Sequence, residues 1–124
     1  MRSSFPCVLA ALLFLPGAYA QSPPNANTQI RAAVKAAPSS LRSTATVRGY
    51  TSGGTVTTLR EGTGPLVCLA DDPASDGFKS ACYHKSLAPF MQRGRGLRRQ
   101  GITAVDSVRR AEIEAGTLAY PSHP

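Results

Sequence analysis

The stretch Leu66–Lys85, LVCLADDPASDGFKSACYHK, decides the expected fold, because it holds two of the chain's three cysteines. Residues 66–70 form a short apolar run that predicts a buried β-strand. Residues 78–84 predict a second strand, and the intervening DDPASDG carries the Asp-Pro and Asp-Gly pairs that are typical of turns. The pattern therefore predicts two adjacent antiparallel strands with one cysteine on each.

Whether those cysteines pair depends on the compartment, which the N-terminus indicates. The segment MRSSFPCVLAALLFLPGAYA has a positive charge at Arg2 and an apolar run at residues 5–16 that is too short to cross a bilayer. It ends in a small-x-small site at Ala20. These features predict a secretory signal peptide over residues 1–20, cleaved after Ala20. We therefore expect a periplasmic or extracellular protein that keeps no transmembrane anchor after processing.

The favoured interpretation of Cys68 and Cys82 is a structural disulfide. Exported compartments are oxidising, and neighbouring antiparallel strands bring Cα atoms within the roughly 4.4–6.8 Å that a disulfide needs. Closing a loop of about 15 residues stabilises a fold by about 3 kcal/mol in the chain-entropy model. For a single small domain with a thin core, that is a large fraction of the free energy of unfolding.

A metal site made from Cys68, Cys82 and His84 is the first alternative. Zinc sites pair their ligands at short spacings such as C-x2-C and H-x3-5-H, and neither pair occurs in this stretch. The carboxylates of DDPASDG also lack the spacing of a calcium-binding loop. Although Cys82 and His84 would share one face of a strand, we predict no metal and no other cofactor.

The second alternative is a small exported hydrolase or thiol-dependent enzyme. Its nucleophile would be Cys82, its general base His84, and its orienting carboxylate Asp71 or Asp72. However, an exported thiol with a cysteine partner is more often oxidised, and the chain has no G-x-S-x-G, H-E-x-x-H or S-x-x-K motif. We therefore rank this enzymatic role below a non-catalytic one.

The rest of the chain predicts helices on either side of the strands. Residues 21–27 are polar and proline-rich and predict a flexible tether, which leaves 28–124 as a single domain. A helix is expected after a cap at Asn27 or Thr28, and it ends before Pro38. Further expected elements are strands at 44–50 and 55–60, a helix that follows Ser86 and ends at Gly101, and a helix that follows Asp106 or Ser107 and runs through Ala115. The expected class is α+β: a small antiparallel sheet of three to four strands with flanking helices and one disulfide.

An arginine-rich segment, QRGRGLRRQG at Gln92–Gly101, lies in one of those helices. Its arginines are Arg93, Arg95, Arg98 and Arg99. The whole chain has 14 lysines and arginines against seven acidic residues, a net charge of +7. Guanidinium groups bind phosphates and carboxylates through paired hydrogen bonds, so these arginines predict an anion-binding face. The alternative is a solvated helix face paired with Asp106, Glu112 and Glu114.

These features make a non-catalytic envelope protein the leading expectation. Its ligand would be an anionic envelope glycan, a lipid headgroup or a protein partner. The export signal and the lack of aromatic residues among the arginines argue against nucleic acid.

A longer run also resembles a known group. LREGTGPLVCLADDPASDGFKSACYHKSLAPFMQRGRGLRRQGI, followed by AEIEAGTL, is similar to exported bacterial proteins that carry VCLADDP…ACYHK…PFMxRGRxLR…EIEAGTL and have no assigned activity. The likeness covers residues 60–118 and implies no catalytic residues or ligands. Proteins of this group continue past EIEAGTL with hydrophobic, strand-like sequence, so the resemblance implies that this chain is a shortened version.

Overall fold

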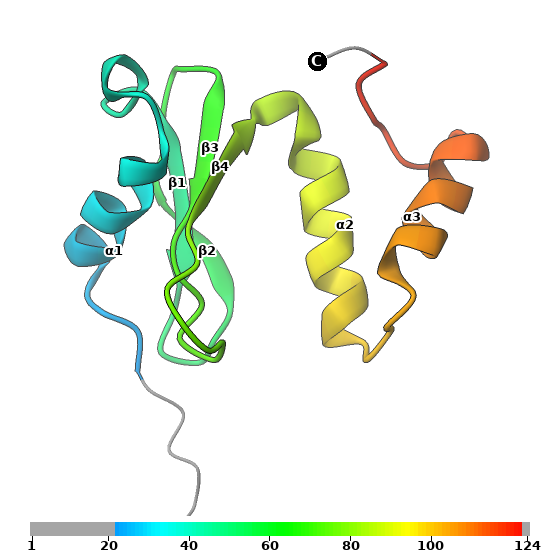
Figure 1. The fold of residues 1–124 in the computed structure, drawn as a ribbon, viewed down its shortest axis with the longest axis horizontal. Helices are drawn as coiled ribbons and strands as arrows, with labels where there is room; N and C mark the ends of the chain where they lie inside the picture. Colours follow the sequence, from blue (N-terminus) through cyan, green and yellow to red (C-terminus); the bar gives the residue numbers. More distant parts are fainter. Residues whose placement is uncertain (1–21, 123–124) are drawn as a thin grey trace, which may run out of the picture.

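The computed structural model describes residues 22–122 and has three α-helices and a four-stranded sheet in that range. The predicted signal peptide, cleaved after Ala20, lies outside the described residues. The helices are α1 (Ala26–Ala33), α2 (Ala88–Arg99) and α3 (Val105–Glu114), and the strands are β1 (Thr46–Tyr50), β2 (Val56–Arg60), β3 (Leu66–Leu69) and β4 (Ala81–His84). Short 3-10 turns lie at η1 (Val34–Ala36), η2 (Ser39–Leu41) and η3 (Lys85–Leu87). In Figure 1, α1 lies on one side of the sheet, α2 lies on the other, and α3 lies beyond α2.

The strands are arranged in the order β2-β1-β3-β4. β1 pairs antiparallel with β2, and β3 pairs antiparallel with β4. β1 and β3 instead run parallel, with Thr46 opposite Val67 and Arg48 opposite Leu69. The predicted α+β class is confirmed, but the sheet is mixed rather than wholly antiparallel. The difference arises because β3 adds to the free edge of β1, where it points the same way as β1, instead of adding to β2.

The loop 61–65 allows this parallel pairing by crossing the start of β1 at close range. The sequence pattern EGTG predicts a turn here, and the structure shows a crossover. The backbone N–H of Gly64 donates to the carbonyl oxygen of Thr44 at 2.8 Å, and that of Gly62 donates to Oγ1 of Thr46 at 3.0 Å. A Cβ atom at Gly62 would lie 2.2 Å from the Thr44 carbonyl oxygen. Glycine is required at this position because a side chain would collide with backbone that cannot move aside.

The core lies between α1 and the sheet. Its buried members are Ala33, Ala37, Ala45, Val47, Cys68 and Ala70. Most of them are alanine, so the helix approaches the sheet closely. The predicted disulfide is confirmed, since Cys68 is bonded to Cys82 and the two residues are directly opposite in the β3–β4 register. Cys68 is fully buried, and Sγ of Cys82 lies 3.7 Å from the carbonyl oxygen of Ala33 in α1.

A buried amide ties α1 to β1. The side chain of Gln29 accepts a hydrogen bond from the backbone N–H of Tyr50 at 2.9 Å and donates to the Tyr50 carbonyl oxygen at 3.0 Å. It also donates to the carbonyl oxygen of Pro24 at 2.8 Å. Gly49 leaves room for this amide, because a Cβ there would lie 2.4 Å from Oε1 of Gln29. Buried polar groups stabilise a fold when they are hydrogen-bonded, so Gln29 fixes the position of the helix along the strand.

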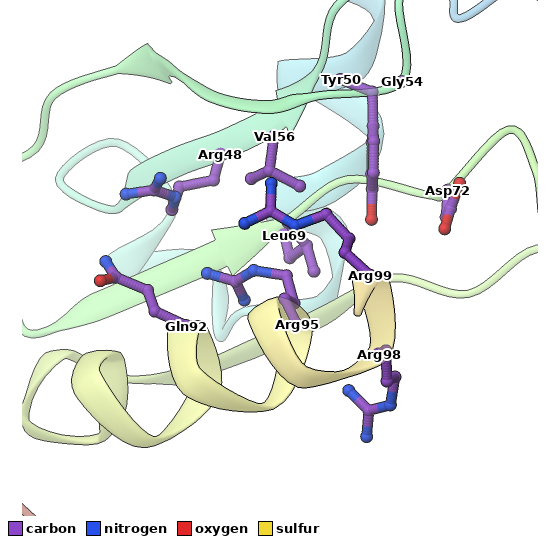
Figure 2. A pocket seen from close by; sticks show the side chains of 10 residues that line it. All are labelled: Arg48, Tyr50, Gly54, Val56, Leu69, Asp72, Gln92, Arg95, Arg98 and Arg99. Carbon is purple, nitrogen blue, oxygen red and sulfur yellow. The ribbon is translucent and has the colours of Figure 1, made fainter. Parts of the chain in front are cut away.

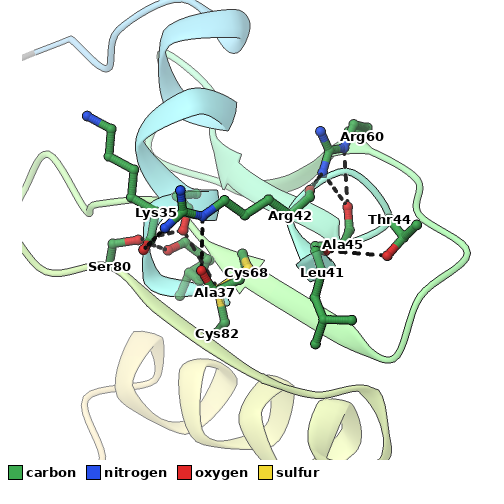
Figure 3. The surroundings of a disulfide bond; sticks show 12 residues. Lys35, Ala37, Leu41, Arg42, Thr44, Ala45, Arg60, Cys68, Ser80 and Cys82 are labelled. Atoms are coloured by element: carbon green, nitrogen blue, oxygen red, sulfur yellow. Dashed lines mark hydrogen bonds between the residues drawn. A yellow bond between two sulfur atoms is a disulfide. The ribbon is translucent and has the colours of Figure 1, made fainter. Parts of the chain in front are cut away.

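Two arginines complete the backbone hydrogen bonding near the disulfide (Figure 3). Arg42 donates to the carbonyl oxygens of Ala37 at 3.0 Å and Lys35 at 3.3 Å, where η1 ends. Arg60 donates to the carbonyl oxygens of Ala45 at 2.8 Å and Arg42 at 2.6 Å. Helix ends leave carbonyl groups without intrahelical partners, so these two arginines serve the fold.

Several element ends differ from the expected ones. Helix α1 starts at Ala26, inside the predicted tether, because the Asn25 side chain, rather than Asn27 or Thr28, accepts from a first-turn amide. The strand expected at residues 78–84 shortens to Ala81–His84, and Phe78 is 69% exposed. Helices α2 and α3 have no side-chain cap, so neither Ser86 nor Asp106 caps a helix here.

The disulfide should carry a measurable part of the stability. We expect the reduced protein to unfold in urea with a free energy of unfolding about 3 kcal/mol lower than the oxidised protein, because the bond restricts the unfolded chain. A Cys68→Ala/Cys82→Ala double variant should be at least as destabilised and should not respond to reductant. Identical urea midpoints for oxidised and reduced wild type would contradict this expectation.

The crossover makes Gly62 sensitive to the smallest substitution. Gly62→Ala should lower the free energy of unfolding by about 1–3 kcal/mol, because the added methyl group overpacks against backbone. Gly53→Ala is the matched control, since the atom nearest to its Cβ would be 3.8 Å away, an ordinary contact. That variant should stay within about 0.5 kcal/mol of wild type in urea unfolding. Equal stability of the two variants would show that the close approach is not maintained in solution.

Candidate anion-binding site

A cavity of about 450 Å³ lies between the sheet and α2. Its size falls in the range of about 300–1,000 Å³ that is typical of small-molecule sites. The lining residues are Arg48, Tyr50, Gly54, Val56, Leu69, Asp72, Gln92, Arg95, Arg98 and Arg99. They come from β1, β2, β3, α2 and the loops after β1 and β3, so the site exists only in the folded chain (Figure 2).

The alternation of side chains along β1 divides its residues between the two faces of the sheet. Val47 and Gly49 face α1, where Val47 joins the core and Gly49 adjoins Gln29. Successive residues of a strand point to opposite faces, so Arg48 and Tyr50 face α2 and line the cavity. An arginine on one of the two inner strands of the sheet thereby lines the same cavity as the arginines of the helix.

Helical spacing brings a second set of polar side chains to the cavity. Gln92, Arg95 and Arg99 are three and four residues apart and therefore share one face of α2. In Figure 2 the guanidinium groups of Arg95 and Arg99 extend toward Val56 and Leu69, on the same side as Arg48. The opposite flank of α2 packs on α3, which explains why Gly94 and Leu97 are buried.

Three of the four arginines that line the cavity have no acidic partner among the described residues and lie on the same side of it. In the part of the chain that the structure describes, no carboxylate lies within ion-pair distance of Arg48, Arg95 or Arg99. Nε of Arg48 and Nη1 of Arg95 are buried and have no hydrogen-bond acceptor among those residues. A buried donor without an acceptor costs about 1–3 kcal/mol, and more when it is charged. The cavity therefore concentrates positive charge and unsatisfied donors.

Tyr50 adds a neutral hydroxyl group to this lining. Burial raises the pKa of Tyr50, and the nearby negative charge of Asp72 raises it further. The hydroxyl group therefore keeps its proton and can donate a hydrogen bond. Asp72 itself is held in a turn, because its Oδ1 accepts from the backbone N–H of Ala74 at 2.9 Å. The lining that the described residues form is thus cationic with a single carboxylate, and both strand and helix contribute to it.

The predicted anion-binding arginines separate into different environments. Arg95, Arg98 and Arg99 line the cavity, although the Arg98 side chain extends away from the other guanidinium groups in Figure 2. Arg93 lies elsewhere: its Nη2 is 2.6 Å from Oε1 of Glu112, and its Nε also donates to this carboxylate. This pair joins α2 to α3. The sequence analysis missed Arg48, whose place beside Tyr50 on an alternating strand is the signal that could have found it.

Arg109 makes an ion pair within α3 and two contacts with Phe90 of α2. Arg109 is buried, pairs with Asp106, and donates to the carbonyl oxygen of Phe90 at 3.2 Å. Its guanidinium carbon lies 3.7 Å from the centre of the Phe90 ring, a cation–π contact. The sequence alternative of a helix face paired with acidic residues therefore holds for Arg93, but with Glu112 alone.

The residues of the enzymatic alternative do not come together. Cys82 is in the disulfide, so it has no free thiol in the oxidised protein. His84 is exposed opposite Leu66 at one end of the β3–β4 pair, and its Nδ1 lies 2.7 Å from the Ser86 hydroxyl oxygen. Asp71 follows the other end of β3, five residues after Leu66 and therefore about 17 Å away at the usual rise of a strand. Its carboxylate accepts from the backbone N–H of Lys79.

Among residues 22–122, no cluster of three or more histidine, cysteine, aspartate or glutamate side chains has an arrangement that could hold a metal ion. Within the same range, no helix has the length and apolar character needed to cross a membrane. Comparison with family models, with curated proteins and with solved structures finds no match to the chain.

The Arg93–Glu112 pair should make stability depend on acid pH. The hydrogen bond from Arg93 lowers the pKa of Glu112. A carboxyl group with a lowered folded-state pKa contributes stability that is present above its unfolded pKa of about 4.3 and is lost as the pH falls through the folded-state value. We therefore expect wild type to lose more stability than Glu112→Gln between pH 6 and pH 3, measured by thermal unfolding.

Glu114→Gln is the matched control for this experiment. It removes a carboxylate from the same helix that makes no ion pair among the described residues. The variant should keep the acid sensitivity of wild type. If Glu112→Gln and Glu114→Gln have the same pH profile as wild type, the pair does not contribute to stability in solution.

Proposed function

We propose that the chain is an exported, non-catalytic envelope protein that binds an anionic ligand in the cavity between the sheet and α2. The observation that carries the proposal is that Arg48, Arg95 and Arg99 line one cavity and have no ion-pair partner among residues 22–122. Export rests on the predicted signal peptide, and the Cys68–Cys82 bond fits an oxidising compartment. Arg48, Arg95 and Arg99 are the principal contacts, and Arg98 adds positive charge at the rim.

Electrostatics explains why an anion suits this cavity. Like charges repel one another, and burial strengthens the repulsion because less water screens it. An anion relieves the repulsion and accepts from the unsatisfied donors on Arg48 and Arg95. Hydrogen bonds to charged groups contribute about 1.5–3 kcal/mol each, so two or three of them support useful affinity. Without an anion, the same arginines are expected to lower the stability of the fold.

The form of the site favours a small anionic group over a protein partner. Arg48 belongs to the strand side of a cavity that α2 covers on the other side. A protein would have to insert a side chain or a terminus to reach it, whereas the anionic group of a glycan or a lipid can enter directly. The enzymatic alternative built on Cys82, His84 and Asp71 draws no support from their positions, because they do not share a site.

Anion binding should appear as stabilisation that depends on the cavity arginines. A ligand that binds only the folded state raises the midpoint of thermal unfolding. We expect inorganic phosphate, sulfate or citrate to stabilise wild type beyond sodium chloride at equal ionic strength. The apparent affinity for these anions, derived from the excess stabilisation, should fall about tenfold in Arg48→Gln and in Arg95→Gln. Each variant loses a charged donor. In low salt without these anions, both variants should be at least as stable as wild type.

Arg110→Gln is the control for net charge, since Arg110 is exposed on α3 away from the cavity lining. It should keep the full stabilisation by the anions. Non-specific salting-out affects all variants equally and therefore cancels in the comparison. The proposal fails if all three variants and wild type respond equally to every anion tested.

A further inference from the structure

We propose that the cavity binds a terminal phosphate group, that is, a phosphomonoester dianion, in preference to a carboxylate, a sulfate monoester or a phosphodiester. The inference rests on the proposed anion-binding function and specifies its ligand class. It depends on the number of donors that reach the cavity, on the balance of charge around it, and on the apolar surface beside the arginines.

The donors outnumber the oxygens of a carboxylate. Three guanidinium groups, the Tyr50 hydroxyl and the Gln92 amide all belong to side chains that line the cavity. Each guanidinium has several N–H groups in a planar fork that matches two oxygens at once. A carboxylate has only two oxygens, whereas a terminal phosphate presents three strong acceptor oxygens in a tetrahedral arrangement. A tetrahedral group can therefore accept from the strand and from the helix at more positions than a planar carboxylate can.

The balance of charge also favours a dianion. Arg48, Arg95 and Arg99 bring positive charge to the cavity, and Asp72 is the only acidic residue in its lining among residues 22–122. A monoanion would therefore leave part of the positive charge without compensation. A phosphomonoester carries about −1.5 to −2 at neutral pH, which is a closer match. The excess of positive charge thus separates a phosphomonoester from a sulfate monoester or a phosphodiester, which carry one negative charge.

The position of the carboxylate orients the ligand. The negative charge of Asp72 acts on Tyr50. In Figure 2 the guanidinium groups of Arg48, Arg95 and Arg99 all lie on the side of Tyr50 that is away from Asp72. Repulsion from Asp72 places the phosphate at the arginine end. The carbon skeleton of the ligand then lies along the ring of Tyr50, and any hydroxyl group that it carries can donate to Asp72. Phosphorylated sugars and phosphate-bearing lipid headgroups both have this chemistry.

The deciding experiment compares probes with the same tail and different heads. The purified protein is titrated calorimetrically at pH 7.5 with hexyl phosphate, hexyl sulfate and heptanoate. We expect hexyl phosphate to bind about tenfold or more tightly than the two monoanions, because it alone carries close to two negative charges at this pH. Arg48→Gln, Arg95→Gln and Arg99→Gln should each remove most of this preference, and Arg110→Gln should leave it unchanged.

The Tyr50→Phe variant tests whether the Tyr50 hydroxyl group binds the phosphate, because it removes the hydroxyl group and keeps the ring. No hydrogen bond of the Tyr50 hydroxyl group occurs among the described residues, so its removal should leave stability near wild type. Affinity for hexyl phosphate should fall several-fold, and affinity for heptanoate should change less. An unchanged phosphate affinity in Tyr50→Phe, together with unchanged affinity in the arginine variants, would overturn the proposed location.

Two further titrations identify the source of the phosphate. Glucose 1-phosphate is the soluble probe, and phosphatidylcholine vesicles with phosphatidic acid are the membrane probe. Binding of either probe that is lost in Arg95→Gln supports the inference and assigns the source. Vesicles with phosphatidylglycerol, a phosphodiester, should bind more weakly than those with phosphatidic acid. Equal binding of both vesicles would overturn the preference for a terminal phosphate.

The outcomes separate the inference from the function on which it rests. If hexyl phosphate, hexyl sulfate and heptanoate bind with equal affinity and all depend on Arg95, anion binding stands and the phosphate assignment is wrong. If none of them binds and inorganic anions do not stabilise the protein, both proposals are wrong. A phosphate preference that vanishes in the three cavity variants and persists in Arg110→Gln supports both.

Discussion

The disulfide between Cys68 and Cys82, packed beneath α1, is the interaction on which the rest of the structure depends. The side chains around it are mostly alanine, so the hydrophobic core of this layer is small and contributes little buried area. A covalent bond in the centre compensates for that by restricting the unfolded chain. The bond also fixes the register of β3 against β4. The other edge of β3 pairs with β1, and Gln29 in turn holds α1 on β1 through two hydrogen bonds to Tyr50.

The core that contains the disulfide lies between α1 and one face of the sheet, so the other face of the sheet does not contribute to that core. Arg48 on that face faces α2, which presents Arg95 and Arg99 instead of an apolar stripe. Long charged side chains cannot pack as densely as aliphatic ones, and their mutual repulsion keeps them apart. The result is a cavity at a place where a typical α+β domain has a second core. Stability on this side comes from the packing of α2 on α3, with the Arg93–Glu112 ion pair and the Arg109–Phe90 contact between them.

The strong positive charge of the chain therefore has several physical roles. Four arginines satisfy carbonyl or carboxylate groups within the fold: Arg42, Arg60, Arg93 and Arg109. Arg48, Arg95 and Arg99 have no such partner among the described residues. Net charge and the density of arginine in one segment cannot separate these groups. Only the positions of acceptors in three dimensions show which guanidinium groups are free to bind a ligand.

The sequence by itself determined the α+β class, the disulfide and the presence of four clustered arginines in one helix, because these follow from local periodicity and from one pair of cysteines. It did not separate Arg95 and Arg99 from Arg93 and Arg98. The tertiary structure alone decided that β3 pairs parallel with β1, since a turn and a crossover of equal length have the same glycine-rich sequence. It also decided that Arg93 binds Glu112 and that Arg48 joins the cavity. Those outcomes depend on which residues, distant in sequence, meet after folding, and no local pattern contains that information.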